Sequence, residues 1–236
     1  MKRVDFDHYS QLSAAAAAMV AAVILENPAP VLGLATGSTP VGMYEELVRM
    51  HRSGVLDMAH VTTVNLDEYC GLSESHPQSY RCFMNRQLFS HVNIPLERTF
   101  VPNGMAADAD AECARYDGLL SALGGADLQV LGLGHDGHIG FNEPAAAFTY
   151  PTHAVTLTEQ TIQANARFFE GIEQQVPRKA ITMGMGAIML AKKILLLVSG
   201  GDKAAILAEA LQGPVTPRIP ASILQLHPNV TLLYSK

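Results

Sequence analysis

The sequence predicts an α/β fold with a Rossmann-like, open and largely parallel sheet that carries helices on both faces. Short apolar runs alternate with segments of helical periodicity along almost the whole chain. Such an alternation builds strand–helix–strand crossovers, whose strands run parallel and whose helices cover the sheet. The chain has 236 residues, enough for one well-buried core, and no Ser- or Pro-rich linker divides it. We therefore expect one domain over residues 1–236.

The apolar runs predict the strands in order, and the segments between them predict helices. Strands are expected over residues 30–36, 61–66, 127–133, 152–157, 179–184, 193–199 and 229–234. Each run is short and mostly apolar, as strands of a buried sheet are. Helical periodicity is clear in residues 40–52 and 202–213, which follow the first and the sixth of these runs.

The N-terminal stretch 13–25, SAAAAAMVAAVIL, is predicted to form an alanine-rich helix. With basic residues before it, this stretch superficially resembles a secretory signal. However, Asp5 and Asp7 intervene, no small-residue cleavage site follows, and Glu26 ends the run. No apolar run approaches the roughly 20 residues that a membrane-spanning helix needs.

Composition excludes several classes of protein. Apolar residues make up 48% of the chain and charged residues 16%, which excludes a disordered chain. The formal net charge of −6 gives no sign of the basic face that nucleic-acid binding requires. The three cysteines form no C-x-x-C pair, so neither a disulfide framework nor a zinc site is indicated. We expect a cytoplasmic protein, a monomer or small homo-oligomer, without nucleic-acid or membrane partners.

A candidate anion-binding loop follows the first strand, and ligands of open α/β sheets bind beyond the carboxyl ends of the strands. Gly37 allows close approach of the backbone, while Ser38 and Thr39 add hydroxyl groups at a helix N-terminus. Thr39 is placed to cap a helix whose first residue is Pro40. These residues suit a phosphate cradle and a plain capped helix equally well. A Walker loop is excluded because no Gly-Lys-Ser/Thr follows.

Two neighbouring carboxylates, Asp67 and Glu68, follow the second strand. Adjacent residues in extended backbone point in opposite directions, so we expect only one of the two to face the ligand cleft. A carboxylate in the cleft can serve as a general base. The alternative for such a pair is a helix-capping or salt-bridged role.

The stretch 129–148, QVLGLGHDGHIGFNEPAAAF, passes from an apolar strand into a glycine-rich loop. Its GLGHDG segment formally matches a dinucleotide-binding fingerprint, but that fingerprint must open a helix, and Pro144 follows Gly137 closely. We therefore predict no nicotinamide or flavin cofactor.

Titratable side chains of this loop favour acid–base chemistry over metal binding. His135, Asp136, His138 and Glu143 are all potential metal ligands, yet a glycine-broken loop fixes their directions poorly, and we predict no metal. A histidine titrates near neutral pH, and flanking carboxylates can orient its ring and stabilise its protonated form. His138 with Asp136 and Glu143 would make such a unit; the alternative is that His138 only shapes the loop.

Two cationic side chains are candidates for neutralising a phosphate held by the Ser38 and Thr39 loop. Arg167 lies late in the helical stretch TEQTIQANARFF, and Lys203 lies where the strand 193–199 leaves through two glycines into a helix. A phosphate dianion needs charge as well as amide donors. As isolated residues, both would be solvated surface charges.

Taken together, these segments make the chain similar to glucosamine-6-phosphate deaminases, of the glucosamine/galactosamine-6-phosphate isomerase family, throughout its length. The segments LGLATGSTPVGMYEEL, VNLDEYCGLSESHPQSYRCFM, LGLGHDGHIGFNEP, QANARFF and LLVSGGDKA occur in the family's order and spacing. The related 6-phosphogluconolactonases share the Gly-Ser-Thr-Pro loop and the Asp-Gly-His element, but typically lack NLDEY and FNEP. Those two segments favour the deaminase.

The resemblance implies conversion of glucosamine 6-phosphate and water to fructose 6-phosphate and ammonia, without a metal or organic cofactor. It implies that His138 assists opening of the sugar ring, with Asp136 and Glu143 tuning its protonation. It further implies that Asp67 moves a proton between C2 and C1. The phosphate contacts that the family pattern implies are Gly37, Ser38, Thr39, Arg167 and Lys203.

One region departs from part of the family. Members that respond to N-acetylglucosamine 6-phosphate carry a serine pair and basic residues soon after the Asn-Glu-Pro element, and a C-terminal extension. Here Ala146 and Ala147, then His153 and Val155, occupy the corresponding stretch. We expect no such activation and no hexamer built around it. The remaining alternatives are a galactosamine-6-phosphate deaminase, a 6-phosphogluconolactonase and a non-catalytic sugar-phosphate sensor.

Overall fold

The computed structural model describes all of residues 1–236, and a seven-stranded sheet forms its centre. The strand order is β1-β10-β9-β6-β2-β3-β5, and every neighbouring pair is parallel. These strands are β1 (Lys2–Phe6), β2 (Val31–Leu34), β3 (Thr62–Asn65), β5 (Thr99–Phe100), β6 (Leu128–Gly132), β9 (Ile194–Ser199) and β10 (Val230–Ser235). The predicted α/β fold class is confirmed.

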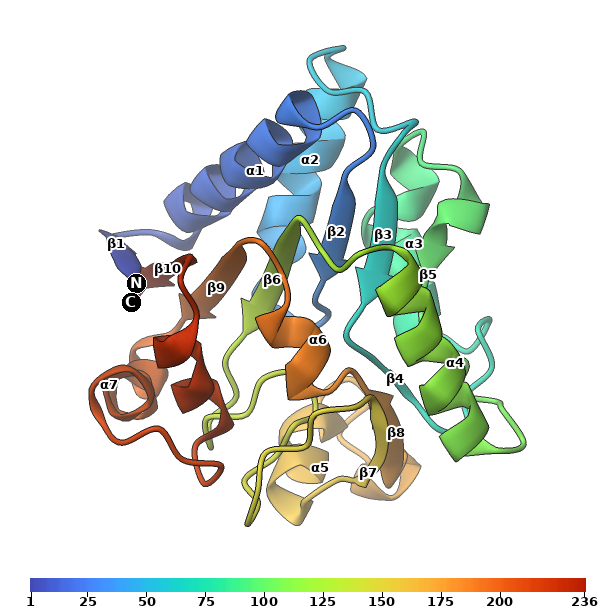
Figure 1. The fold of residues 1–236 in the computed structure, drawn as a ribbon, viewed down its shortest axis with the longest axis vertical. Helices are drawn as coiled ribbons and strands as arrows, with labels where there is room; N and C mark the ends of the chain where they lie inside the picture. The colour runs from blue at the N-terminus through green and yellow to red at the C-terminus, as the bar shows by residue number, and fades with distance from the viewer.

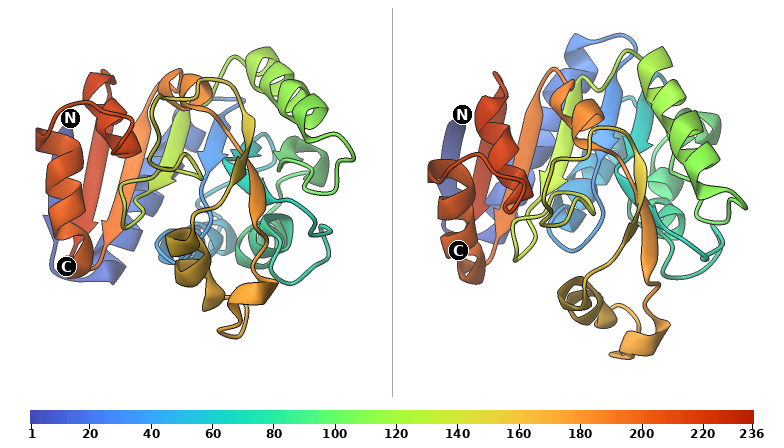
Figure 2. Two further views of the ribbon diagram at one scale, coloured as in Figure 1. Left: turned by 90° about the horizontal axis from the view of Figure 1, so that it is seen from below. Right: turned by 60° about the horizontal axis from the view of Figure 1, so that its bottom comes forward.

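Helices cover both faces of this sheet, as Figures 1 and 2 show. Helices α1 (Tyr9–Glu26) and α2 (Val41–Arg52) pack together on one face, and α6 (Met185–Met189) lies with the 3-10 helix η5 (Pro220–Leu226) on the other. The remaining helices are α3 (Tyr80–Gln87), α4 (Ala109–Ala122), α5 (Glu159–Ala166) and α7 (Ala204–Gln212), with short 3-10 turns η1 (Phe89–His91), η2 (Leu96–Arg98), η3 (Glu173–Gln175) and η4 (Gly201–Lys203).

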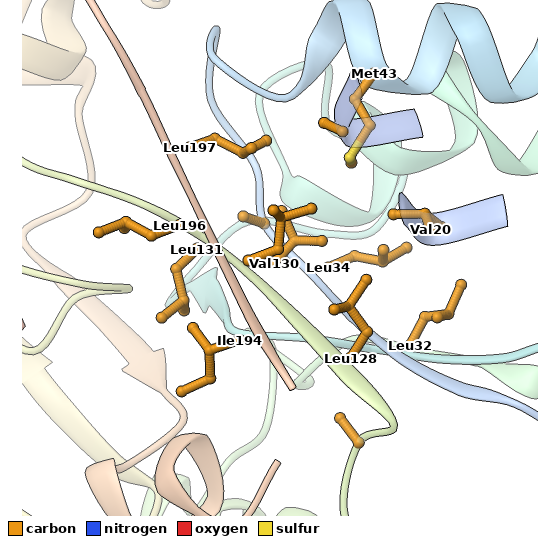
Figure 3. Packing of buried hydrophobic residues seen from close by; sticks show 14 of the residues in the cluster. Val20, Leu32, Leu34, Met43, Leu128, Val130, Leu131, Ile194, Leu196 and Leu197 are labelled. Atoms are coloured by element: carbon orange, nitrogen blue, oxygen red, sulfur yellow. The ribbon is translucent and has the colours of Figure 1, made fainter. Parts of the chain in front are cut away.

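The main core fills both sides of the central strands. Successive side chains of a strand point to opposite faces, so a strand covered on both sides is apolar at nearly every position. In Figure 3, Leu197 points toward Met43 of α2, whereas Leu131 and Leu196 point away from it. This explains why the runs at β6 and β9 were recognisable in the sequence as continuous apolar segments.

Helix α1 confirms the predicted alanine-rich helix. By length and composition alone it could cross a membrane. In the fold it contacts α2 and strands β1, β9 and β10, and its small side chains, such as Ala16 and Ala17, are fully buried. Alanine allows this close helix–sheet approach, so the apolar composition of α1 is accounted for by the core.

A second, three-stranded sheet differs from the prediction of one largely parallel sheet. Residues 152–157 and 179–184 do contain strands, β7 (His153–Thr156) and β8 (Lys179–Thr182), but both pair antiparallel, in the order β4-β8-β7. The chain between β6 and β7 contains no helix, so no crossover returns β7 to the main sheet, and α5 then connects β7 to an antiparallel partner, β8.

Three strands were not predicted from the sequence. β1 is an edge strand that alternates between exposed and half-buried residues, β5 has two residues, and β4 (Asp67–Tyr69) has three. β4 and β5 carry too few residues for a periodicity to be detected, and the sequence of β1, KRVDF, is mostly charged rather than apolar. β4 matters most, because it continues directly from β3 and carries the Asp67 carboxylate into the second sheet.

Candidate active site

A cavity of about 480 Å³ lies beyond the carboxyl ends of the central strands β2, β3, β6 and β9. This is the position at which open parallel sheets bind ligands. Eight of the nine predicted site residues line it: Gly37, Ser38, Thr39, Asp67, Asp136, His138, Arg167 and Lys203. They come from loops far apart in the sequence, so the parallel topology brings them together.

Asp67 is buried at the base of the cavity, with 5% of its surface exposed. Burial, together with the negative charge of neighbouring Glu68, raises the pKa of Asp67 to about 8. Gly140 lies close by: a Cβ built on it would make ordinary van der Waals contact with Asp67 Oδ2 at 3.5 Å and would crowd Thr182 Oγ1 at 3.0 Å. A carboxylate with a pKa near the working pH is suited to accept and return a proton.

Glu68 points the other way, as the alternation of an extended backbone requires. Its carboxylate accepts hydrogen bonds from the amides of Tyr69, Tyr80 and Arg81, at 2.9, 2.9 and 3.0 Å. Tyr80 and Arg81 begin helix α3, so Glu68 satisfies amides that have no partner within that helix. The two roles that the sequence allowed for this pair are therefore both filled: Glu68 caps a helix, and Asp67 faces the cavity.

His138 and Asp136 form a close pair in the loop after β6. Nδ1 of His138 lies 2.7 Å from Asp136 Oδ1, and the His138 amide donates to the same oxygen at 3.1 Å. Burial alone would raise the pKa of Asp136, but the hydrogen bond and charge of His138 hold it below its ordinary value. The ring of His138 lies against Gly134, where a Cβ would overlap it. The glycine-rich sequence of this loop thus makes room for the ring.

Glu143, the ninth predicted residue, is not part of the cavity lining. Its Oε2 accepts a hydrogen bond of 2.9 Å from the amide of Thr158, the residue that caps α5, while its buried Oε1 has no partner. No hydrogen bond or ion pair joins Glu143 to His138. Its influence on His138 stays a prediction.

The loop after β2 presents free amide donors. Gly37 has a φ of 96°, and the backbone N–H groups of Gly37, Ser38 and Thr39 donate to no protein acceptor. The predicted helix cap is wrong, because α2 begins at Val41 after Pro40, without a side-chain cap. The hydroxyl of Tyr9 instead accepts a hydrogen bond of 2.8 Å from the Gly42 amide.

The two candidate cations lie at the same end of the cavity. Nζ of Lys203 donates to the Leu133 carbonyl at 2.6 Å. Burial and the charge of Arg167 lower the pKa of Lys203, against the opposing effect of Asp202. Arg167 itself is exposed at the C-terminal cap of α5, with its guanidinium 4.7 Å from the Phe168 ring centroid. Two cations and a loop with free amides, all lining one cavity, can together form a cradle for an anion.

Sequence reasoning missed several residues around this cavity. Tyr69 and Tyr80 line it, with ring centroids 4.8 Å apart; Tyr80 stacks on Phe141, whereas the ring of Tyr69 is tilted against that of Phe141. His135, which the sequence offered as a potential metal ligand, instead pairs with Asp202 at 2.8 Å, a partner that sequence reasoning missed, and no three His, Cys, Asp or Glu side chains gather in a way that could hold a metal ion. These contacts join distant segments, so local patterns gave no signal for them.

Comparison with known proteins decides the family. The family model of glucosamine-6-phosphate isomerases/6-phosphogluconolactonase matches residues 7–233. The chain belongs to this family. A glucosamine-6-phosphate deaminase of Lachnoclostridium phytofermentans is 55% identical over 233 residues, which cover 99% of this chain and 98% of that protein. A glucosamine-6-phosphate deaminase of Clostridium perfringens is 53% identical, with coverage of 99% and 96%.

Solved structures agree with membership of the glucosamine-6-phosphate isomerase/6-phosphogluconolactonase family. One, described as a monomeric glucosamine-6-phosphate deaminase, is 49% identical with a TM-score of 0.98, and covers 100% of this chain and 98% of its own. A 6-phosphogluconolactonase from Shewanella baltica has a TM-score of 0.81 at 21% identity, with coverage of 100% and 98%. The similarity to the 6-phosphogluconolactonase shows only that the two proteins share a fold.

Proposed function

We propose that this protein is a glucosamine-6-phosphate deaminase, which converts glucosamine 6-phosphate and water to fructose 6-phosphate and ammonia. The observation that carries the proposal is that buried Asp67 faces the same cavity as the His138–Asp136 pair and a cationic cradle. Isomerisation needs one carboxylate beside C1 and C2, ring opening needs a proton donor and acceptor beside the ring oxygen, and the phosphate needs an anchor.

In the proposed mechanism, His138 exchanges a proton with the ring oxygen and opens the pyranose. Asp136 lies 2.7 Å from Nδ1 of His138 and orients the ring, which leaves Nε2 for the substrate. A positioned acid–base group of this kind contributes roughly 10² to 10⁴ in rate. Glu143 would act on this unit from outside the cavity, as the family resemblance implies.

Asp67 then removes the proton from C2 of the open sugar and returns it to C1 through an enolamine. Its raised pKa is compatible with both directions of transfer at neutral pH. The substrate's ammonium group favours the ionised carboxylate at the moment when a base is needed. The product of this transfer is a C2 iminium ion; water attacks C2, and ammonia leaves.

The phosphate is proposed to bind at the loop of Gly37, Ser38 and Thr39, with Arg167 and Lys203 supplying charge. Free amides, a helix N-terminus and two cations are complementary to a phosphate dianion. Fixing this non-reacting end places C1 and C2 between Asp67 and His138. Binding energy from the phosphate thereby lowers the barrier at the reacting carbons.

The proposal extends to the domain organisation, localisation, oligomeric state and regulation of the protein. We infer that residues 1–236 act as one domain and that the protein is cytoplasmic and a monomer or small homo-oligomer; the relative of TM-score 0.98 is described as monomeric. The alanines at 146 and 147 offer neither charge nor hydroxyl to a second sugar phosphate. Activation by N-acetylglucosamine 6-phosphate is therefore not expected, and sigmoidal kinetics relieved by that compound would contradict this.

A coupled ammonia assay tests the proposed reaction. The purified protein should release ammonia and form fructose 6-phosphate in equal amounts from glucosamine 6-phosphate, without added metal or cofactor. Faster turnover of galactosamine 6-phosphate would move the assignment to the C4 epimer. Hydrolysis of 6-phosphogluconolactone without ammonia release from either amino sugar would overturn the proposal.

A further inference from the structure

Tyr9, the first residue of α1, bridges the N-terminal helix and the proposed phosphate-binding loop. Its hydroxyl donates to the carbonyl of Thr39 at 2.9 Å, with the carbonyl of Ser38 at 3.3 Å, and accepts from the amide of Gly42 at 2.8 Å. These contacts span about 30 positions of sequence. One hydroxyl therefore contacts the loop that follows β2 and the first turn of α2 together.

The contacts orient the peptide groups of the loop. All peptide bonds of the chain are trans, and the C=O and N–H of a trans peptide point in opposite directions. The peptide that joins Ser38 and Thr39 turns its carbonyl toward Tyr9, so the amide of Thr39 points away from it. That amide has no protein acceptor, and Thr39 lines the cavity.

The position of Tyr9 is itself fixed by close packing between α1 and α2. The hydroxyl of Ser13 donates to the Tyr9 carbonyl at 2.9 Å, one turn along α1. Gly42 permits the approach, because a Cβ there would overlap the Ser13 hydroxyl and lie 3.1 Å from Cε1 of Tyr9. The ring is thus held on one side of the loop while the cavity lies on the other.

We propose that Tyr9 is a positioning residue for phosphate binding: its hydroxyl holds the Ser38 and Thr39 carbonyls on its side of the loop, and by fixing the Ser38–Thr39 peptide it presents the Thr39 amide to the substrate phosphate. The inference rests on the proposed function for the identity of the anion. Tyr9 does not touch the substrate, so its removal weakens binding at the phosphate end and leaves the acid–base groups in place.

The test is Tyr9→Phe, which removes only the hydroxyl, compared with Tyr150→Phe as a matched control. Tyr150 is 63% exposed, does not line the cavity, and its hydroxyl makes no hydrogen bond. Loss of one neutral hydrogen bond corresponds to a change of roughly three- to tenfold. We expect the KM for glucosamine 6-phosphate and the inhibition constant of inorganic phosphate to rise together by this factor in Tyr9→Phe, with kcat within about twofold.

Other outcomes decide against the proposal. Unchanged KM and unchanged phosphate inhibition in a folded Tyr9→Phe protein would overturn it, as would a fall in kcat at constant KM. If the wild-type protein released no ammonia, the proposed function would fail, and calorimetric binding of inorganic phosphate to wild type and Tyr9→Phe would still test the role of Tyr9. If wild type bound no phosphate either, both the phosphate loop and the role of Tyr9 would be wrong.

Discussion

Thr182 lies directly opposite Asp67 in the small antiparallel sheet, and its hydroxyl accepts a hydrogen bond of 3.0 Å from the amide of Phe141. Thr182 therefore joins the strand that carries Asp67 to the loop that carries His138. The side chain of Asn142 adds a hydrogen bond of 2.9 Å to the carbonyl of Met183. The second sheet thus fixes the distance between the two proposed catalytic groups.

The first prediction concerns the proposed base. Asp67→Asn should retain substrate binding but lose the proton transfer between C2 and C1, lowering kcat by roughly 10² to 10⁴. The measurement is incorporation of solvent deuterium at C1 together with ammonia release. Normal ammonia release by this variant would show that another group is the base.

The second prediction concerns the pH dependence of catalysis. Because burial raises the pKa of Asp67 to about 8, the fraction of ionised base in the free enzyme increases with pH and reaches one half at about pH 8. After the ionisations of the substrate are accounted for, kcat/KM should rise as pH increases through about 8 and level off above that value. A profile that stays flat from about pH 6 to pH 9 would contradict this assignment.

The third prediction concerns the stability of the fold. The pKa of Asp67 is higher in the folded protein, about 8, than the value of about 3.9 expected in an unfolded chain. The folded state then binds more protons, so this group lowers the free energy of unfolding as pH rises from about 4 to 8. The Tm of Asp67→Asn should exceed that of wild type by a margin that grows over this range.

Glu209→Gln provides the control for this stability measurement. Glu209 is an exposed carboxylate on α7 whose side chain makes no hydrogen bond. Its removal should leave the pH dependence of Tm unchanged. An equal effect of both substitutions would attribute the pH dependence to net charge rather than to burial of Asp67.

The fourth prediction concerns the His138–Asp136 pair. Each of the variants His138→Gln and Asp136→Asn should lower kcat, because either one breaks the 2.7 Å contact. If the two side chains act as one unit, the double variant costs about as much as the more damaging single variant. Steady-state kinetics of the three proteins check this, and additive losses would mean that the two residues act independently.

The fifth prediction concerns Thr182. Thr182→Val leaves the Phe141 amide without its buried acceptor, which costs about 1–3 kcal/mol of unfolding free energy. Because the loop that carries His138 also loses an anchor, kcat should fall as well. Urea unfolding and kinetics measure both effects, with the exposed Thr156→Val of the same sheet as a control. A Thr182→Val protein with wild-type stability and kcat would refute the anchoring role.

Much of the fold and of the site follows from the sequence by local physics. Strands such as β6 and β9 are covered on both faces, so they appear as apolar runs, and α1 is recognisable by its alanines. Polar residues placed after such strands must gather at one edge of a parallel sheet. This rule is sufficient to predict that Asp67, His138 and Lys203 lie near one another, and all three line the cavity.

Only the tertiary structure decided how these groups are oriented and held. The sequence left open which of Asp67 and Glu68 faces the cavity, and the amides of α3 decided it by binding Glu68. The sequence also predicted a helix cap at Thr39. In the structure, the hydroxyl of Tyr9, from the distant helix α1, instead accepts a hydrogen bond from the Gly42 amide. The physical reason is that periodicity reports burial along a short segment, whereas hydrogen bonds between distant segments depend on packing that no single segment contains.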